Sequence, residues 1–124
     1  GSPADRDGVH LGAGIEAEVV PVAVAAGDSL APEAIITALR ARGLQRIVCE
    51  GGPALASQFV EAGVIDEYCL TVAPTVEAAS APLFAVRADA RPDTEVAGML
   101  VDAAGFSYLR LRALRADPAH EATT

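Results

Sequence analysis

The feature that most constrains the fold is the alternation of short apolar runs with segments of helical spacing. Residues 19–25, 45–50 and 66–74 are apolar runs of strand length. Between them, residues 32–42 and 53–62 repeat apolar side chains at helical spacing. This order of strand, helix, strand, helix and strand predicts an α/β domain with a mainly parallel sheet flanked by helices.

Proline and glycine mark the ends of both predicted helices. Pro32 and Pro53 suit the first helical turn, and Gly43 and Gly63 suit the position that follows the last turn. The Asp-Ser pair at 28–29 supplies N-cap candidates for the first helix. Both helices therefore have start and stop signals.

The C-terminal part predicts antiparallel pairing. Residues 95–102 and 106–114 both alternate apolar and polar side chains, and the short connection at 103–105 contains a glycine. This pattern indicates a terminal β-hairpin, with Arg110 and Arg112 on one side of its second strand.

Length and composition indicate one domain. Residues 1–2 are typical of a cloning scar, residues 3–116 form the domain, and residues 117–124 are a polar tail. The net charge of −8, with no lysine, makes nucleic acid and anionic membranes unfavourable partners. Since no signal peptide or membrane-spanning run is apparent, we expect a cytoplasmic protein.

The cysteines and histidines offer little chemistry. Cys49 and Cys69 lie in apolar runs, which favours buried small side chains on strands over a disulfide. His10 and His120 stand in polar segments without the spacing of a metal site, so we expect no metal.

The most informative segment is the Glu-Gly-Gly-Pro turn at 50–53, which joins an apolar run to a predicted helix. Glycines let a ligand approach the backbone, and the first helical turn offers free N–H groups to an anion such as a diphosphate. The alternative is a tight corner without a ligand. Likewise, Glu50 is either an exposed acidic strand end or a carboxylate that accepts N–H bonds from a pyrimidine or pteridine edge.

Two other polar positions have competing interpretations. Ser57 on the second helix is a surface hydroxyl or a phosphate contact, since no triad-like partners accompany it. Asp66 and Glu67, at the start of the run 66–74, form a solvated cap or a subunit contact.

Three segments together resemble the reductase domain of bacterial riboflavin biosynthesis, which is dihydrofolate-reductase-like. They are GLQRIVCEGGPAL at 43–55, FVEAGVIDE at 59–67 and LTVAP at 70–74. The family pattern is a strand, Glu-Gly-Gly-Pro, a helix ending near Ala-Gly, an Asp-Glu step and a strand ending in Ala-Pro.

The resemblance implies a mixed sheet flanked by helices and an NADPH-dependent oxidoreductase. The reaction would reduce a phosphoribosylamino-pyrimidine to its ribitylamino product, with hydride passing from nicotinamide to the sugar C1′. By motif position, Glu50 matches a substrate-binding carboxylate, and family members are commonly homodimers. The positions that match the NADPH-binding loop and helix start are Gly51, Gly52, Pro53, Ala54, Leu55, Ala56, Ser57 and Gln58.

The chain departs from the family pattern in ways that limit the expected activity. It matches only the C-terminal portion of the reductase domain and lacks the deaminase domain with its zinc motif. Residues 75–79 replace a Gly-rich step. We therefore expect a partial domain with weak or no turnover alone. The alternatives are a non-catalytic nucleotide-binding or assembly module, and a reductase of another pteridine- or flavin-like substrate.

Overall fold

A computed structural model describes residues 14, 17–22, 30–78 and 83–115 of the chain. The chain divides into two compact units, Gly1–Val48 and Cys49–Thr124. The predicted caps at 28–29, both histidines and the polar tail lie outside the described residues. Within the described residues, no helix is long and apolar enough to cross a membrane.

The first unit contains one described helix, α1 (Pro32–Arg40). Proline occupies its first turn, as predicted, and the carbonyl of Ala31 accepts the first helical bonds. Gly43 follows the last helical turn and has φ of +80°. The N–H of Gly43 bonds to the carbonyl of Arg40, and the next N–H bonds back to Leu39. This paired ending is a Schellman motif, and it confirms the predicted helix stop.

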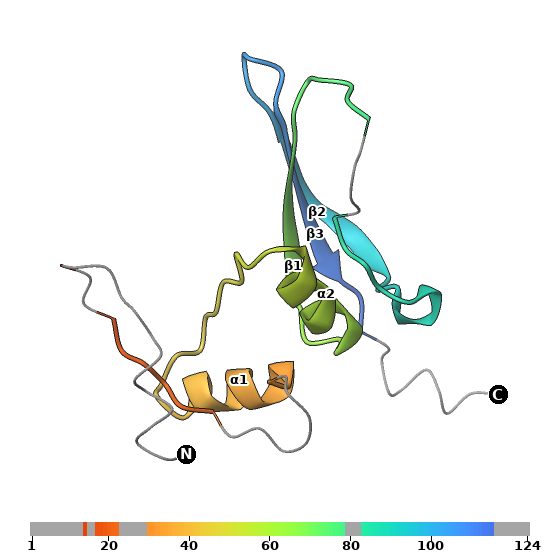
Figure 1. The fold of residues 1–124 in the computed structure, drawn as a ribbon. Coiled ribbons are helices and arrows are strands. Elements are labelled where there is room, and N and C mark those ends of the chain that lie inside the picture. The colour runs from red at the N-terminus through yellow and green to blue at the C-terminus, as the bar shows by residue number, and fades with distance from the viewer. Residues whose placement is uncertain (1–13, 15–16, 23–29, 79–82, 116–124) are drawn as a thin grey trace. The chain divides into compact units, whose positions relative to one another are not determined.

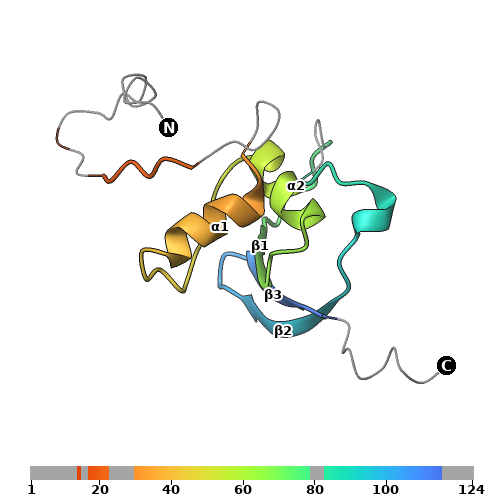
Figure 2. The same cartoon turned by 90° about the horizontal axis from the view of Figure 1, so that it is seen from below.

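The second unit contains helix α2 (Pro53–Glu61) and a sheet of three strands, β1 (Glu67–Val72), β2 (Thr94–Val101) and β3 (Ser107–Ala113). The strand order is β1-β3-β2, so the last strand lies in the middle (Figure 1, Figure 2). Both pairings are antiparallel. A short 3₁₀ helix, η2 (Ala88–Ala90), precedes β2.

Helix α2 provides the most buried side chains of the described residues. Its buried residues are Ser57, Phe59 and Val60, whereas α1 buries only Pro32 among its residues. Gly63 follows the helix with φ of +66°, and its N–H bonds to the carbonyl of Val60. Val60 and Tyr68 line the same hollow of about 440 Å³, so the C-terminal half of α2 faces the start of β1.

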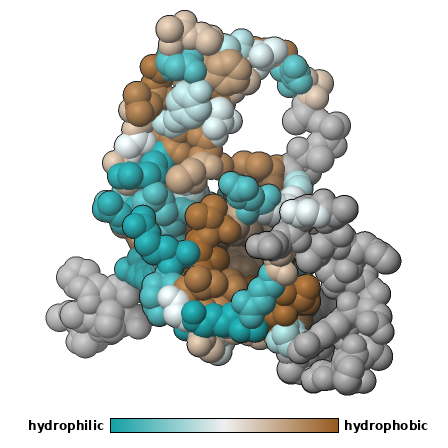
Figure 3. All heavy atoms as spheres, turned by 90° about the vertical axis from the view of Figure 1, so that its left-hand side faces the viewer, coloured by the Kyte–Doolittle hydropathy of each residue, from teal (hydrophilic) through white to brown (hydrophobic). Residues whose placement is uncertain are grey.

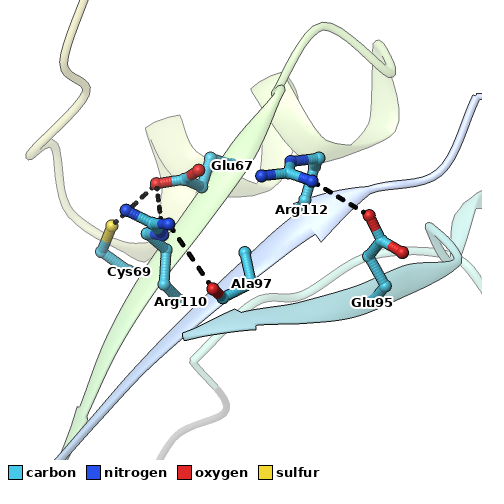
Figure 4. A network of polar contacts seen from close by, with 6 residues as sticks. All are labelled: Glu67, Cys69, Glu95, Ala97, Arg110 and Arg112. Atoms are coloured by element: carbon cyan, nitrogen blue, oxygen red, sulfur yellow. Dashed lines mark hydrogen bonds and ion pairs between the residues drawn. The ribbon is translucent and has the colours of Figure 1, made fainter. Parts of the chain in front are cut away.

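The register separates a polar face of the sheet from an apolar one, because residues paired across strands share a face. On the polar face, Arg110 lies 3.5 Å from a carboxylate oxygen of Glu67, and Arg112 lies 3.2 Å from one of Glu95 (Figure 4). The large apolar residues of the other face, called the apolar face, are Tyr68, Leu70, Val72, Val96, Met99, Val101, Leu109 and Leu111. The two arginines thus share a side, as the alternation predicted.

The turn between β2 and β3 is held by one carboxylate. Asp102 Oδ1 accepts the N–H groups of Ala104 and Phe106 at 2.9 and 3.0 Å, and Oδ2 accepts the Tyr108 hydroxyl at 2.8 Å. Gly105 takes φ of +89° in this turn. An aspartate followed by a glycine thus closes the connection that the sequence predicted at 103–105.

The structure corrects the predicted parallel sheet. Residues 44–50 are exposed and form no strand, and residues 19–22 form none either. A strand exists only where a neighbour completes its ladder of hydrogen bonds, and no described segment pairs with either run. The described sheet is therefore antiparallel, whereas the prediction was of a mainly parallel one.

The structure also corrects the predicted burial of the cysteines. Cys49 and Cys69 are both free and exposed. Cys49 lies in the irregular segment, and Cys69 points to the polar face of the sheet, where its thiol lies 3.9 Å from Glu67 Oε1. Their apolar sequence neighbours therefore did not determine their burial.

Candidate functional site

The Glu-Gly-Gly-Pro turn leads directly into α2, and all its residues belong to the second unit. Gly52 occupies the N-cap position of α2 with φ of −62° and ψ of 178°, and Pro53 is the first helical residue. Glu50 is the first residue of the turn and is exposed. The sequence therefore correctly predicted where this helix begins.

The two glycines of the turn differ in what surrounds them. A Cβ added to Gly51 would collide with Leu55 Cδ2 and lie 3.1 Å from Leu55 Cβ and Cγ. A Cβ added to Gly52 would meet no atom within 4 Å. Gly51 is thus favoured by packing within the chain, because a side chain there would displace Leu55. Gly52 has no packing requirement, and its negative φ does not require glycine either.

The first turn of α2 presents unpaired donors. The N–H of Ala56 bonds to the carbonyl of Gly52 at 3.0 Å, whereas those of Ala54 and Leu55 have no carbonyl acceptor among the described residues. The N-cap has no side-chain bond, and no acidic residue lies in the first turn. By contrast, α1 carries Glu33 in its first turn. The positive end of α2 is therefore uncompensated and is suited to an anion.

Most of the predicted cofactor-binding residues are accessible. Ala56 is half-buried and Ser57 is buried. The exposed ones are Gly51, Gly52, Pro53, Ala54, Leu55 and Gln58. The sequence predicted that the Ser57 hydroxyl lies at the surface or contacts a phosphate, whereas the side chain is buried.

Ser57 uses both functions of its hydroxyl within the chain. Its Oγ donates to the carbonyl of Pro53 at 2.6 Å and accepts the N–H of Ala85 at 2.8 Å. Four residues further along α2, Glu61 Oε1 accepts the N–H of Arg87 at 3.2 Å. Sequence reasoning missed the role of Glu61, although the spacing of four residues places it on the same helix face as Ser57.

Asp66 and Glu67 are held in ion pairs within the chain. Asp66, which precedes β1, pairs with Arg115, and its carbonyl accepts the N–H of Ala113 at 2.9 Å. Glu67 pairs with Arg110 on the polar face. The side chains of both acids are accessible, so these pairs are surface interactions that contribute about 0–1 kcal/mol each.

Three side chains on the sheet or in its β2–β3 turn have shifted pKa values. The Tyr108 hydroxyl, followed by backbone N–H groups of the turn, holds the pKa of Asp102 below its usual range. The same hydrogen bond raises the pKa of Tyr108. Burial raises the pKa of Tyr68, whose ring makes an edge contact with that of Phe84. These shifts are explained by local structure and do not indicate a proton donor.

No group of three or more His, Cys, Asp and Glu side chains suited to a metal ion occurs in the described part of the chain. The chemistry available at the turn is therefore that of backbone N–H groups, one exposed carboxylate and open space above Gly52.

The chain is similar to proteins of a known family. The model of the RibD C-terminal domain family matches residues 10–84. A crystal structure of a pyrimidine reductase-like protein from Corynebacterium diphtheriae is similar, with a TM-score of 0.59 and 26% identity. The match covers 67% of this chain and 35% of that one, so the chain spans about a third of that protein. No curated protein matches the chain. Because the family match covers more than half of the 124 residues, the chain belongs to the RibD C-terminal domain family.

Proposed function

We propose that this chain is the NADPH-contacting part of a pyrimidine reductase of riboflavin biosynthesis. The parent reaction converts a phosphoribosylamino-pyrimidine to its ribitylamino product. Membership of the RibD C-terminal domain family and the similarity to a pyrimidine reductase-like protein support this class of reaction. The open space at Gly52, beside the uncapped start of α2, is the observation that carries the assignment of the cofactor-binding region.

The residues of the turn fit a dinucleotide. The N–H groups of Ala54 and Leu55 are available to phosphate oxygens, and Gly52 leaves room for a close approach. Gly51, Pro53, Ala56, Ser57 and Gln58 complete the binding segment by supporting or flanking it. When bound, NADPH supplies the hydride, and the chain orients it. Because the net charge is −8, phosphate recognition depends on this local backbone rather than on a general positive field.

Glu50 is assigned to the substrate. It is exposed and adjoins the cofactor turn, so a pyrimidine held there would lie beside the dinucleotide. A carboxylate accepts two N–H bonds from such a ring edge. We assign no residue of this chain to the phosphate group of the pyrimidine substrate.

We propose a homodimer formed through the apolar face of the sheet. Val72, Val96, Met99 and Val101 share this face and are 57%, 62%, 69% and 62% exposed. Apolar residues are visible at the surface in Figure 3. Adjacent exposed apolar side chains on one face favour association.

We also propose a cytoplasmic location, because both cysteines are free thiols, as is usual in a reducing compartment.

Sedimentation tests the dimer. Met99→Asp should shift the chain to monomer, because it introduces a charge into the apolar face. Leu100→Asp is the matched control, since Leu100 is equally exposed but points to the opposite face. A compact wild-type monomer at micromolar concentration would contradict this proposal.

Calorimetric titration with NADPH tests the function directly. Gly52→Val should weaken binding about 10- to 100-fold, equivalent to about 1.4–2.8 kcal/mol, because the side chain fills the space for the phosphate. Glu50→Gln should leave NADPH affinity nearly unchanged and weaken the pyrimidine substrate. Ala31→Val is the matched control, because it enlarges the N-cap residue of α1 instead.

The alternatives predict other results. A folded wild-type chain that does not bind NADPH would refute the cofactor assignment and favour an assembly module. A different result would favour another reducible substrate on the same scaffold. In that case the wild type binds NADPH, and Glu50→Gln weakens a pteridine or flavin ligand as much as it weakens the pyrimidine.

A further inference from the structure

Residues 83–87 form a strap along one face of α2. The N–H of Ala85 donates to Ser57 Oγ at 2.8 Å, and the N–H of Arg87 donates to Glu61 Oε1 at 3.2 Å. In an extended chain, alternate N–H groups point the same way, and on a helix residues four apart lie one above the other. Two side chains of α2 therefore hold the strap as a neighbouring strand would.

The two attachment points differ in what lies behind them. Ser57 is 7% exposed, and its hydroxyl also donates to the carbonyl of Pro53 at 2.6 Å. Pro53 is the first residue of α2 and directly follows Gly52. Glu61 is exposed and is the last residue of α2, eight residues after Pro53. Only the Ser57 attachment thus connects the strap to the start of the helix.

The strap is itself anchored on the sheet. The ring of Phe84 meets that of Tyr68 on β1 edge to face, with centroids 6.1 Å apart and an interplanar angle of 68°. Such an aromatic contact contributes specific geometry beyond its burial. Contacts therefore run from β1 through Tyr68 and Phe84 to Ser57 and on to the first turn of α2, all within the second unit.

A hydroxyl that bonds back to the carbonyl four residues earlier adds little stability by itself. Its value here lies in the second bond, because the strap holds the hydroxyl in one orientation. The carbonyl of Pro53 is thereby held as well, and with it the N–H of Ala54, which lies in the same peptide plane. The N–H of Leu55 belongs to the next peptide unit of the same helical turn.

We propose that Ser57 is a positioning residue, which ties the strap to the first turn of α2 and holds the N–H groups of Ala54 and Leu55 in the orientation that binds a diphosphate. The proposal rests on the function proposed above. It assigns Ser57 an indirect role, since its hydroxyl is buried and bonds to two backbone groups of the chain rather than to the ligand.

Two variants separate positioning from simple attachment of the strap. Ser57→Ala removes the link to the first turn, whereas Glu61→Ala removes the other attachment of the same strap. We expect Ser57→Ala to weaken NADPH and inorganic pyrophosphate about five- to tenfold, because displaced donors no longer converge on the phosphates. Reduced nicotinamide mononucleotide, which carries no diphosphate, should lose much less. Glu61→Ala should change no affinity by more than about twofold.

Amide hydrogen exchange provides a readout without ligand. In Ser57→Ala, exchange at Ala56, whose N–H bonds to the carbonyl of Gly52, should accelerate; in Glu61→Ala, only Arg87 should respond. Ser57→Thr, which keeps the hydroxyl, should restore both exchange and affinity. Equal effects of Ser57→Ala and Glu61→Ala on NADPH, or unchanged Ala56 exchange in Ser57→Ala, would overturn the proposal. A wild-type chain that binds no NADPH, with Ala56 exchange still accelerated by Ser57→Ala, would refute the proposed function alone.

Discussion

Replacing Gly51 by alanine tests whether this glycine is required by packing within the chain. The new Cβ would lie 3.1 Å from Leu55 Cβ and Cγ and would collide with Leu55 Cδ2. Leu55 is 39% exposed, so its outer methyl can rotate away at a cost of about 0.5–1.5 kcal/mol for an unfavourable rotamer. The close approach to Leu55 Cβ remains after that rotation. We expect a net loss of about 1–2 kcal/mol, within the usual range for overpacking.

Thermal or urea unfolding measures this loss, which corresponds to a decrease in Tm of about 4–8 °C for each kcal/mol in a small domain. The control is a double-mutant cycle. In a Leu55→Ala background Cγ and Cδ2 are gone and only the approach to Cβ remains, so Gly51→Ala should cost less by the rotamer cost of Leu55, a coupling of about 0.5–1.5 kcal/mol. Equal costs of Gly51→Ala in both backgrounds would refute the packing argument.

Three further outcomes concern the β2–β3 hairpin. Gly105→Ala should destabilise by about 1–2 kcal/mol in urea unfolding, because φ is +89° and the new Cβ would approach Pro74 at 3.3 Å. Gly98→Ala is its control and should cost less than about 1 kcal/mol, since no atom lies closer than 3.9 Å. Because the pKa of Asp102 is lowered in the fold, its stabilisation is present above the ordinary pKa and is lost as pH falls through the folded value. Tyr108→Phe should raise that pKa in an NMR titration and weaken this acid dependence, and an unchanged pKa would contradict the role of the hydroxyl.

Local signals in the sequence predicted the helix boundaries because they act within a few residues. A proline at the first turn and a glycine with positive φ after the last one set the ends of both α1 and α2. The connection at 103–105 was equally local, since Asp102 caps the turn with its own neighbours. Such features depend on backbone chemistry that a short window contains.

The prediction of a strand at 45–50 was wrong, and the reason is physical. An apolar run becomes a strand only when a neighbour satisfies its N–H and carbonyl groups, and that neighbour is distant in sequence. The same reasoning applies to Cys49 and Cys69, whose burial depends on what covers them. The attachment of Ala85 to Ser57 spans 28 residues, so no local pattern contained it. The cofactor and substrate assignments stay predictions.

The Gly-Gly pair suggested either a tight corner or a ligand site. The surroundings of Gly51 support the first interpretation, and those of Gly52 support the second. Gly51 fits the tight corner, because Leu55 packs against it and a side chain there would displace Leu55. Gly52 has neither a crowded neighbour nor a positive φ, and as an N-cap it supplies no side-chain acceptor to the exposed N–H groups behind it. Ser, Thr, Asn or Asp would stabilise the helix more at that position. A glycine there leaves the helix start open and accessible, which favours a ligand as the missing acceptor. Gly52→Ser should therefore stabilise the chain by up to about 0.5 kcal/mol while weakening NADPH, and a serine variant that binds NADPH as tightly as the wild type would contradict this reasoning.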